Sequence, residues 1–266
     1  MVNIRAILYQ RLKHTNCSTY ESTPPMTERA QPLLATLIDA DNVPAKYAEA
    51  ILKEVSSIGE PALRRVYGDW TSGRLKRWSE KILALGLVAH QQTANTSGKN
   101  ASDIGLVIDA MDILHGRRFD GFVLVSSDSD FTSLANRLRE DGLMVIGIGE
   151  KKTPEPLRNV CNRFIFIENI IADEGEAGVE KQTSAKEQPR KAAKLLLEAM
   201  ARIQQEDEWF HLGQLGQAVV AAHPDFDTRT YGKPKLSELV AAIRGFETKR
   251  EGNSLLVRYK EPRSNA

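Results

Sequence analysis

The sequence predicts an α/β protein with a parallel sheet flanked by helices, followed by a small winged-helix-like α+β domain. Over residues 33–167, short apolar runs of strand character alternate with helical patterns of about 10–15 residues, as in successive βαβ units. A polar stretch with almost no large apolar residues then interrupts the pattern. Beyond it, short helical patterns lead into a two-strand ribbon, which is the order of elements in a winged helix.

Composition narrows the class of protein. The chain has 266 residues, enough for one domain and a smaller one, with 27% charged and 41% hydrophobic residues. The formal net charge of +1 offers no bulk attraction for nucleic acid, so any such contact needs local basic patches. Two cysteines cannot build a disulfide framework, and no Cys/His spacing suits zinc, which favours a cytoplasmic protein. No apolar run approaches the about 18 residues of a membrane span, so we expect no membrane partner.

The apolar patterns predict the position of each element in order. We expect strands at residues 33–38, 62–67, 87–92, 121–126, 143–148 and 164–167, and helices at 45–57, 75–85, 103–115, 131–140 and 155–162. Gly86 is expected to end the second helix. In the helix at 103–115 we expect Ile104, Val107, Ile108 and Met111 to face inward.

Four segments follow from these patterns. Residues 1–31 are expected to be a disordered or over-annotated extension, although their few acidic residues also give a weak likeness to a transit peptide. Residues 32–171 form the α/β domain, residues 172–190 a linker, and residues 191–261 the second domain.

Carboxylates follow two of the predicted strands. Asp39 ends the first strand, and Asp128 and Asp130 follow the fourth. In parallel sheets a ligand site lies at the carboxyl ends of the strands, near the point where strand order reverses. Asp103 begins a helix and Asp109 comes six residues later, a separation that turns a helix by about 600° and leaves the two side chains about 120° apart. We therefore expect Asp103 alone of these two to face the site.

Four carboxylates in one cleft would repel one another and raise one another's pKa values. A bound Mg²⁺ or Mn²⁺ would relieve this repulsion, since both ions prefer oxygen ligands. The alternative is that these residues form turns or cap helices. Asp130 in particular could cap the helix that begins at Phe131, and Asp41 competes with Asp39 for the role at the first strand.

Three motifs in this region read Ile38-Asp39-Ala-Asp-Asn42, Lys99-Asn-Ala-Ser-Asp103-Ile-Gly-Leu-Val-Ile-Asp109-Ala and Leu124-Val-Ser-Ser127-Asp128-Ser-Asp130-Phe131. In this order they resemble the motifs of the NYN domain, a member of the PIN-like nuclease superfamily. The resemblance covers about residues 33–170 and implies a PIN-like (Rossmannoid) fold and metal-dependent cleavage of RNA. It implies a catalytic, metal-binding set made of Asp39, Asp103, Asp128 and Asp130.

Further residues are expected to bind substrate. By the resemblance, Asn42 orients the site or contacts a phosphate, and Ser127 lies within hydrogen-bonding reach of a metal-bound water or a phosphate oxygen. Lys99 is expected to hold the scissile phosphate. Trp70 and Arg74 follow the second strand, and an aromatic ring beside a cation is a common way to hold single-stranded RNA. Trp78 has helical spacing with apolar neighbours, so we assign it to the core.

Three further motifs lie in the C-terminal part of the chain: Trp209-Phe-His-Leu212-Gly-Gln-Leu215-Gly216-Gln, Pro224-Asp-Phe226-Asp-Thr-Arg-Thr-Tyr231-Gly232 and Lys235-Leu236-Ser-Glu-Leu239. With them, roughly residues 192–259 resemble the LOTUS (OST-HTH) domain. The resemblance implies RNA binding or protein docking. We expect Tyr231, Lys233 and Lys235 to form an exposed basic loop that contacts RNA.

The leading hypothesis is therefore a metal-dependent ribonuclease, a cytoplasmic hydrolase with an appended RNA-binding domain. A tethered RNA-binding domain raises the local concentration of RNA at the active site. One alternative is an RNA-binding regulatory scaffold without catalysis. Another is a haloacid-dehalogenase-type phosphatase, with Asp39 as nucleophile and Asp41 as acid/base. The hypothesis names RNA as partner and leaves open a protein partner for the LOTUS domain and a homo-oligomer.

Overall fold

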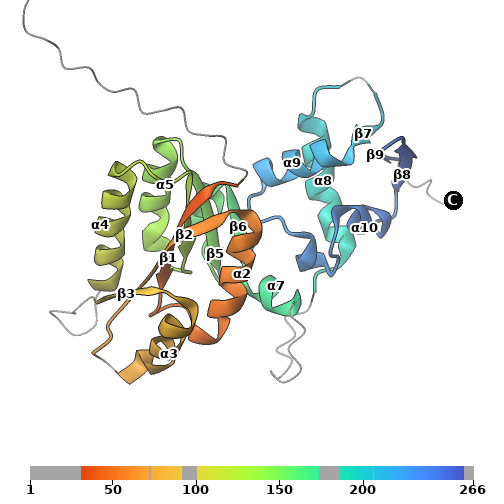
Figure 1. The fold of residues 1–266 in the computed structure, drawn as a ribbon. Helices are drawn as coiled ribbons and strands as arrows, with labels where there is room; N and C mark the ends of the chain where they lie inside the picture. The colour runs from red at the N-terminus through yellow and green to blue at the C-terminus, as the bar shows by residue number, and fades with distance from the viewer. Residues whose placement is uncertain (1–30, 72, 92–100, 174–185, 206, 261–266) are drawn as a thin grey trace, which may run out of the picture. The chain divides into compact units, whose positions relative to one another are not determined.

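A computed structural model of the chain describes residues 31–71, 73–91, 101–173, 186–205 and 207–260 (Figure 1). The expected N-terminal extension, apart from Gln31, lies outside these residues, as do Lys99 and the middle of the expected linker. None of the described helices is long and apolar enough to cross a bilayer.

The first domain is built on a sheet of six parallel strands in the order β3-β2-β1-β4-β5-β6. The strands are β1 (Leu33–Asp39), β2 (Glu60–Gly68), β3 (Val88–Gln91), β4 (Gly121–Val125), β5 (Met144–Gly149) and β6 (Arg163–Phe166). All six predicted strands are present, within two residues at each end. Since the chain builds outward from β1 to β3 and then returns to the other side of β1, strand order reverses between β1 and β4.

Helices cover both faces of the sheet. The described helical segments of this domain are η1 (Ala45–Tyr47), α2 (Ala48–Ile58), η2 (Gly73–Leu75), α3 (Lys76–Leu85), α4 (Ala101–His115), η3 (Ser129–Phe131), α5 (Thr132–Glu140), α6 (Glu155–Val160) and α7 (Ile167–Asp173). α2, α3 and α7 pack on one face, and α4, α5 and α6 on the other. Gly86 ends α3 in the left-handed conformation, with φ of 61°. The sequence patterns did not predict α7, which begins at the residue directly after β6, so that strand and helix share one apolar run.

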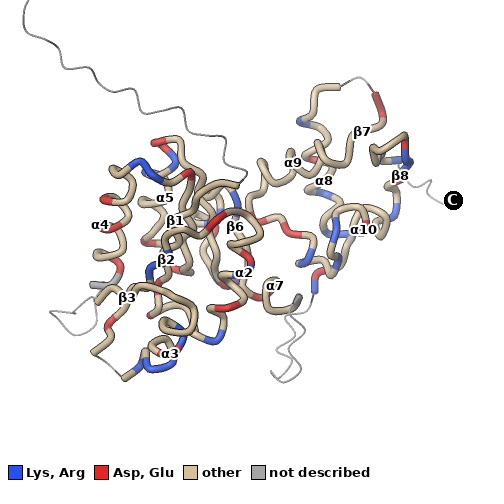
Figure 2. The backbone as a smooth tube through the Cα atoms, in the orientation of Figure 1, with Lys and Arg blue, Asp and Glu red and all other residues tan. Residues whose placement is uncertain are grey.

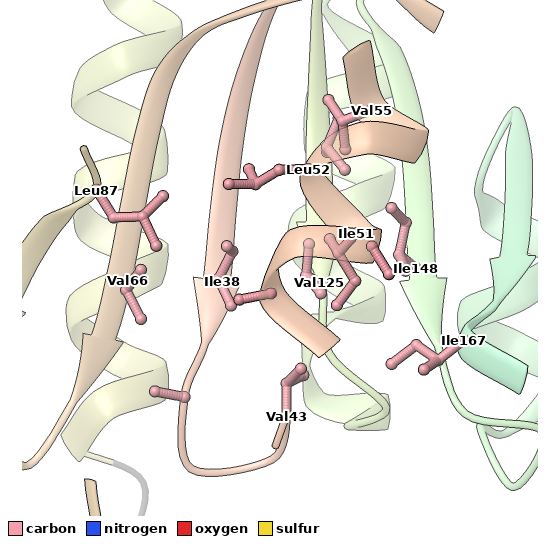
Figure 3. Close-up of a cluster of buried hydrophobic side chains, with 14 of the residues drawn as sticks. Ile38, Val43, Ile51, Leu52, Val55, Val66, Leu87, Val125, Ile148 and Ile167 are labelled. Atoms are coloured by element: carbon pink, nitrogen blue, oxygen red, sulfur yellow. The ribbon is translucent and has the colours of Figure 1, made fainter. Parts of the chain in front are cut away.

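Alternation along β1 divides its side chains between two apolar cores. Ile38 lies in one core with Ile51 and Val55 of α2 (Figure 3), and Leu34 belongs to the same core. Ala35 and Leu37 point to the opposite core, under α4 and α5. Both faces of the strand are buried, which explains why β1 is a nearly continuous apolar run. Asp39 continues the series of Ala35 and Leu37, so its side chain lies on the α4 face.

The orientation of α4 corrects one prediction. Ile104 and Ile108 are 60% and 58% exposed, whereas Leu106 and Ala110 are buried against the sheet. The helix is apolar on most of its circumference, so hydrophobic periodicity alone did not identify the face that packs.

The C-terminal domain has its own core and a small antiparallel sheet in the order β7-β9-β8. Its elements are η4 (Pro189–Lys191), α8 (Ala192–Arg202), β7 (Phe210–His211), α9 (Leu212–Ala222), η5 (Thr228–Tyr231), α10 (Leu236–Ala241), β8 (Phe246–Glu251) and β9 (Ser254–Tyr259). Leu196, Leu215, Leu239 and Val257 are fully buried at its centre. Three helices with a terminal ribbon confirm the winged-helix-like α+β prediction.

Close packing between β5 and β6 generates the first testable prediction. A Cβ atom added at Gly147 would overlap the ring of Phe164 and lie 2.9 Å from the Cys161 sulfur, and both of these side chains are buried. We expect Gly147→Ala to lower the free energy of unfolding by about 1–3 kcal/mol, because the core has no room for the methyl group. Urea unfolding measures this loss. Gly73→Ala is the control, since nothing lies within 4 Å of its added Cβ; equal midpoints for the two variants would contradict the prediction.

Candidate functional site

Asp39 is the most buried carboxylate of the predicted set, with a relative exposure of 1%. Its Oδ2 accepts hydrogen bonds from the Asn42 side-chain amide at 2.7 Å and from the Ser126 hydroxyl at 2.8 Å. Its Oδ1 accepts from the backbone N–H groups of Asp41 and Asn42, at 3.2 and 3.3 Å. Four donors therefore fix the orientation of this carboxylate at the end of β1.

Burial and hydrogen bonding act in opposite directions on Asp39. Burial raises the pKa of its carboxyl, and the hydrogen bonds from Asn42 and Ser126 partly offset that rise. The nearby charge of Asp41 raises it further. The donors therefore reduce the cost of keeping a negative charge in the protein interior.

Ser126 is a site residue that the sequence did not identify. It is 3% exposed, donates to Asp39 and accepts a hydrogen bond from the Asp128 backbone N–H at 3.1 Å. It follows β4 directly, and the register of Ile38 with Val125 brings it beside Asp39. Ser126 lies beside Asp39 only because β1 and β4 are neighbours, and no sequence pattern shows which strands are neighbours.

Ser127, the serine that the sequence did single out, points elsewhere. Its hydroxyl oxygen accepts from the Glu150 backbone N–H at 2.8 Å, which links the end of β4 to the end of β5. The role of Ser127 toward water or phosphate stays a prediction.

Asp128, not Asp130, caps the helical segment after β4. Asp128 is the N-cap of η3, and its Oδ1 accepts from the Asp130 backbone N–H at 2.9 Å. The alternative that Asp130 caps this helix is therefore wrong. Asp130 lies exposed in the first turn of η3.

Asp103, in the first turn of α4, interacts electrostatically with the other carboxylates. Partial burial and the negative charges of Asp39, Asp128, Asp130 and Asp41, in that order, raise the pKa of Asp103 to about 6. Side chains from β1, from the β4–η3 turn and from α4 thus interact in one region, at the point where strand order reverses.

Asp109, on the same helix, has a different set of partners. Its carboxylate accepts hydrogen bonds from the Arg65 guanidinium and the Tyr67 hydroxyl of β2, and His90 Nδ1 lies 3.9 Å away. Burial, followed by the bond to Asp109, raises the pKa of Tyr67. Asp109 therefore fastens α4 to β2, while Asp103 lies among like charges, as its position in the helix predicted.

The carboxylates of this region suit a hard divalent cation, because such ions prefer oxygen ligands and because the carboxylate charges repel one another without one. Yet among the residues that the structure describes, no group of three or more His, Cys, Asp or Glu side chains is arranged to hold a metal ion. Ion binding would therefore require these carboxylates to move closer together.

The residues predicted to contact RNA in the first domain have distinct environments. Trp70 is half-buried and donates its Nε1–H to the His90 carbonyl at 2.9 Å. The Arg74 side chain is 74% exposed, with Nη2 3.8 Å from Asp41 Oδ1. Trp78 is buried and donates to the Val43 carbonyl at 2.8 Å, which confirms its assignment to the core.

In the C-terminal domain the expected exposed loop is only partly exposed. Tyr231 is 9% exposed and packs with Phe226 at a ring-centroid distance of 5.9 Å, and burial raises its pKa to about 12. The expectation that Tyr231 lies on an exposed loop is wrong, because its ring belongs to the domain core. Lys233 is half-buried and Lys235 is exposed.

The bond between Ser126 and Asp39 generates a stability prediction. Ser126→Ala removes a donor to a buried carboxylate, so we expect the free energy of unfolding to fall by about 1–3 kcal/mol. Urea unfolding in the presence of a chelator measures the change. Ser129→Ala, at an exposed position of η3, should stay within about 0.5 kcal/mol of the parent protein. A Ser126 variant as stable as this control would argue against the bond.

The raised pKa of Asp103 generates a pH prediction. Between its ordinary pKa of 3.8 and the folded value of about 6, the folded chain holds a proton that the unfolded chain has lost. Stability is therefore lost as pH rises through this window. Asp103→Asn cannot ionise, so its melting temperature relative to the parent should increase from pH 4 to about pH 7 and then level off.

Thermal melts at low salt with chelator measure this difference. Asp112→Asn, at an exposed position of the same helix, is the control and should show a difference that does not vary with pH. A pH-independent difference for Asp103→Asn would contradict the prediction.

Comparison with known protein families tests the two resemblances found in the sequence. The NYN domain family model matches residues 33–168, just over half of the chain, and the OST-HTH/LOTUS domain model matches residues 184–257. A comparison with curated proteins finds no significant match. A Vibrio parahaemolyticus crystal structure of a protein of unknown function is similar at 21% identity and a TM-score of 0.46, over 55% of this chain and 98% of that one.

A second solved structure, MurG from Acinetobacter baumannii, is similar at 11% identity and a TM-score of 0.35, over 80% of this chain and 70% of that one. The family match fits the structure, because six parallel strands between two helical layers form a PIN-like α/β fold. The family match favours the nuclease hypothesis over the phosphatase alternative. The chain belongs to the NYN domain family and carries a C-terminal OST-HTH/LOTUS domain.

Proposed function

We propose that this protein is a metal-dependent ribonuclease that hydrolyses RNA phosphodiester bonds with Mg²⁺ or Mn²⁺. The observation that carries the proposal is the convergence of carboxylates on Asp103, whose pKa is raised to about 6 by burial and by its acidic neighbours. NYN is a PIN-like nuclease domain and LOTUS an RNA-binding domain, which supports RNA as the substrate.

In this proposal Asp39, Asp103 and Asp128 hold the metal, and Asp130 contributes negative charge from its exposed position. A divalent ion would lower the pKa of a bound water and offset charge on the reacting phosphate. Asn42 and Ser126 orient the Asp39 carboxylate through their hydrogen bonds. Asp128 is held in turn by its capping bond to the Asp130 N–H, so two of the ligands come from a strand end and a capped turn, and Asp103 comes from α4.

The C-terminal domain would hold RNA near this site. Lys235 is exposed and Lys233 half-buried beside the η5 turn, so both amines are candidates for phosphate contacts. A tethered domain of this kind increases the local concentration of RNA without adding contacts at the active site. A protein partner for this domain, a homo-oligomer and a cytoplasmic location remain predictions of the same proposal.

The proposal predicts cleavage of single-stranded RNA by the full chain in Mg²⁺ or Mn²⁺, abolished by EDTA. We expect Asp103→Asn and Asp128→Asn each to reduce kcat/KM by at least about a hundredfold, because each removes charge from the metal site. Gel-resolved cleavage of a labelled oligonucleotide measures the rate.

Asp112→Asn is the matched control for Asp103→Asn, since it removes an exposed carboxylate from the same helix. Full activity in Asp128→Asn would contradict the site assignment. The separation of the described carboxylates favours one alternative, a scaffold that binds RNA without cleaving it. RNA binding by the parent protein without hydrolysis in any of several divalent metals would support that alternative.

A further inference from the structure

A cleft of about 330 Å³ opens beside the candidate site, between the turn after β1 and the start of α3. Residues 40–46 form one wall, and Arg74, Leu75, Arg77 and Trp78 the other. Its volume falls within the range of about 300–1,000 Å³ that is usual for small-ligand pockets, and it is open to solvent.

The polar lining of this cleft is mainly basic. Lys46, Arg74 and Arg77 are exposed and line it, with Asp41 as the only carboxylate among the lining residues. The inner walls are apolar, because Val43, Leu75 and Trp78 are buried there. Cations above an apolar floor suit a phosphate-linked sugar, whose charged group and carbon skeleton need both kinds of surface. Figure 2 shows Lys and Arg gathered along the start of α3.

The position of the cleft ties it to the carboxylates. Asp39 ends β1 and faces the α4 side of the sheet, and the turn that follows it leads to Lys46 on the α3 side. Asp41 stands between the two regions: its charge raises the pKa of Asp103, and its Oδ1 lies 3.8 Å from Arg74. A strand of RNA that crosses the carboxyl edge of the sheet would thus pass directly from a basic cleft to an acidic site.

We propose that this basic cleft binds the phosphate backbone of single-stranded RNA next to the scissile bond, with Lys46 and Arg77 as its main cationic contacts. The inference rests on the proposed function, which supplies RNA as the substrate. It adds the side of the carboxylates on which the RNA strand lies. Backbone contacts of this kind position the strand without reading its sequence.

The test measures binding and cleavage separately. Fluorescence anisotropy with a labelled single-stranded RNA, in EDTA so that the probe stays intact, compares the parent chain with the double variant Lys46→Glu/Arg77→Glu. We expect the Kd to rise about tenfold or more for uridine-rich and adenosine-rich probes alike, since phosphate contacts do not depend on sequence. The slope of log K against log salt should fall by about 1.4, about 0.7 for each lost contact. Both positions are exposed, so the melting temperature should remain close to that of the parent.

The control variant Arg117→Glu/Arg118→Glu makes the same change in net charge between α4 and the start of β4, at the opposite edge of the sheet. An unchanged Kd and salt slope in the cleft variant would overturn the inference, and so would an equal loss in the control. If the parent chain binds RNA but does not cleave it in Mg²⁺ or Mn²⁺, the proposed function fails, while the binding comparison still decides the role of the cleft.

Discussion

The hydrogen bond from Ser126 to the buried carboxylate of Asp39 is the contact on which the candidate site depends. It joins the ends of two strands that are 87 residues apart in the chain. The bond exists because the chain returns to β1 after building β2 and β3, so that β4 pairs with β1 and strand order reverses there. Ser126 also receives the N–H of Asp128, so the same hydroxyl sets the path of the next acidic turn.

Helix α4 shows how one element serves both structure and chemistry. Two of its three aspartates lie on different sides of the helix: Asp109 is paired with Arg65 and held by Tyr67, and Asp103 stays among carboxylates. The Asp109 contacts fix the helix on the sheet. That anchorage lets the helix hold Asp103 close to like charges, a position that repulsion alone would not favour.

The turn after β1 divides two surfaces of opposite charge. The Asp39 carboxylate lies on one side, and the basic cleft lined by Lys46 and Arg77 on the other; Asp41 and Asn42, which donate to Asp39, also line the cleft. An RNA strand needs both, because cations attract its phosphates and a carboxylate site alone would repel them. In the C-terminal domain, burial of Tyr231 leaves Lys235 as the more accessible of the proposed RNA contacts.

Local patterns in the sequence predicted the six strands of the first domain and the principal acidic residues. The β1 and β4 runs are apolar because both faces of those strands are buried, and Asp39 and Asp128 stand where the runs stop. The three quoted motifs indicated the NYN domain that the family match shows, and helical geometry separated Asp103 from Asp109. These features could be predicted because each depends on spacing within a few residues.

Tertiary structure decided the rest. Ser126 could not be preferred over Ser127 until β4 was known to lie beside β1, since only that register aims its hydroxyl at Asp39. The buried face of α4 depended on which side met the sheet, because its apolar residues nearly surround the helix. Lys46 and Arg77 share a cleft only because α3 folds back against the turn after β1. In each case the deciding contact joins segments distant in the chain, which no local pattern records.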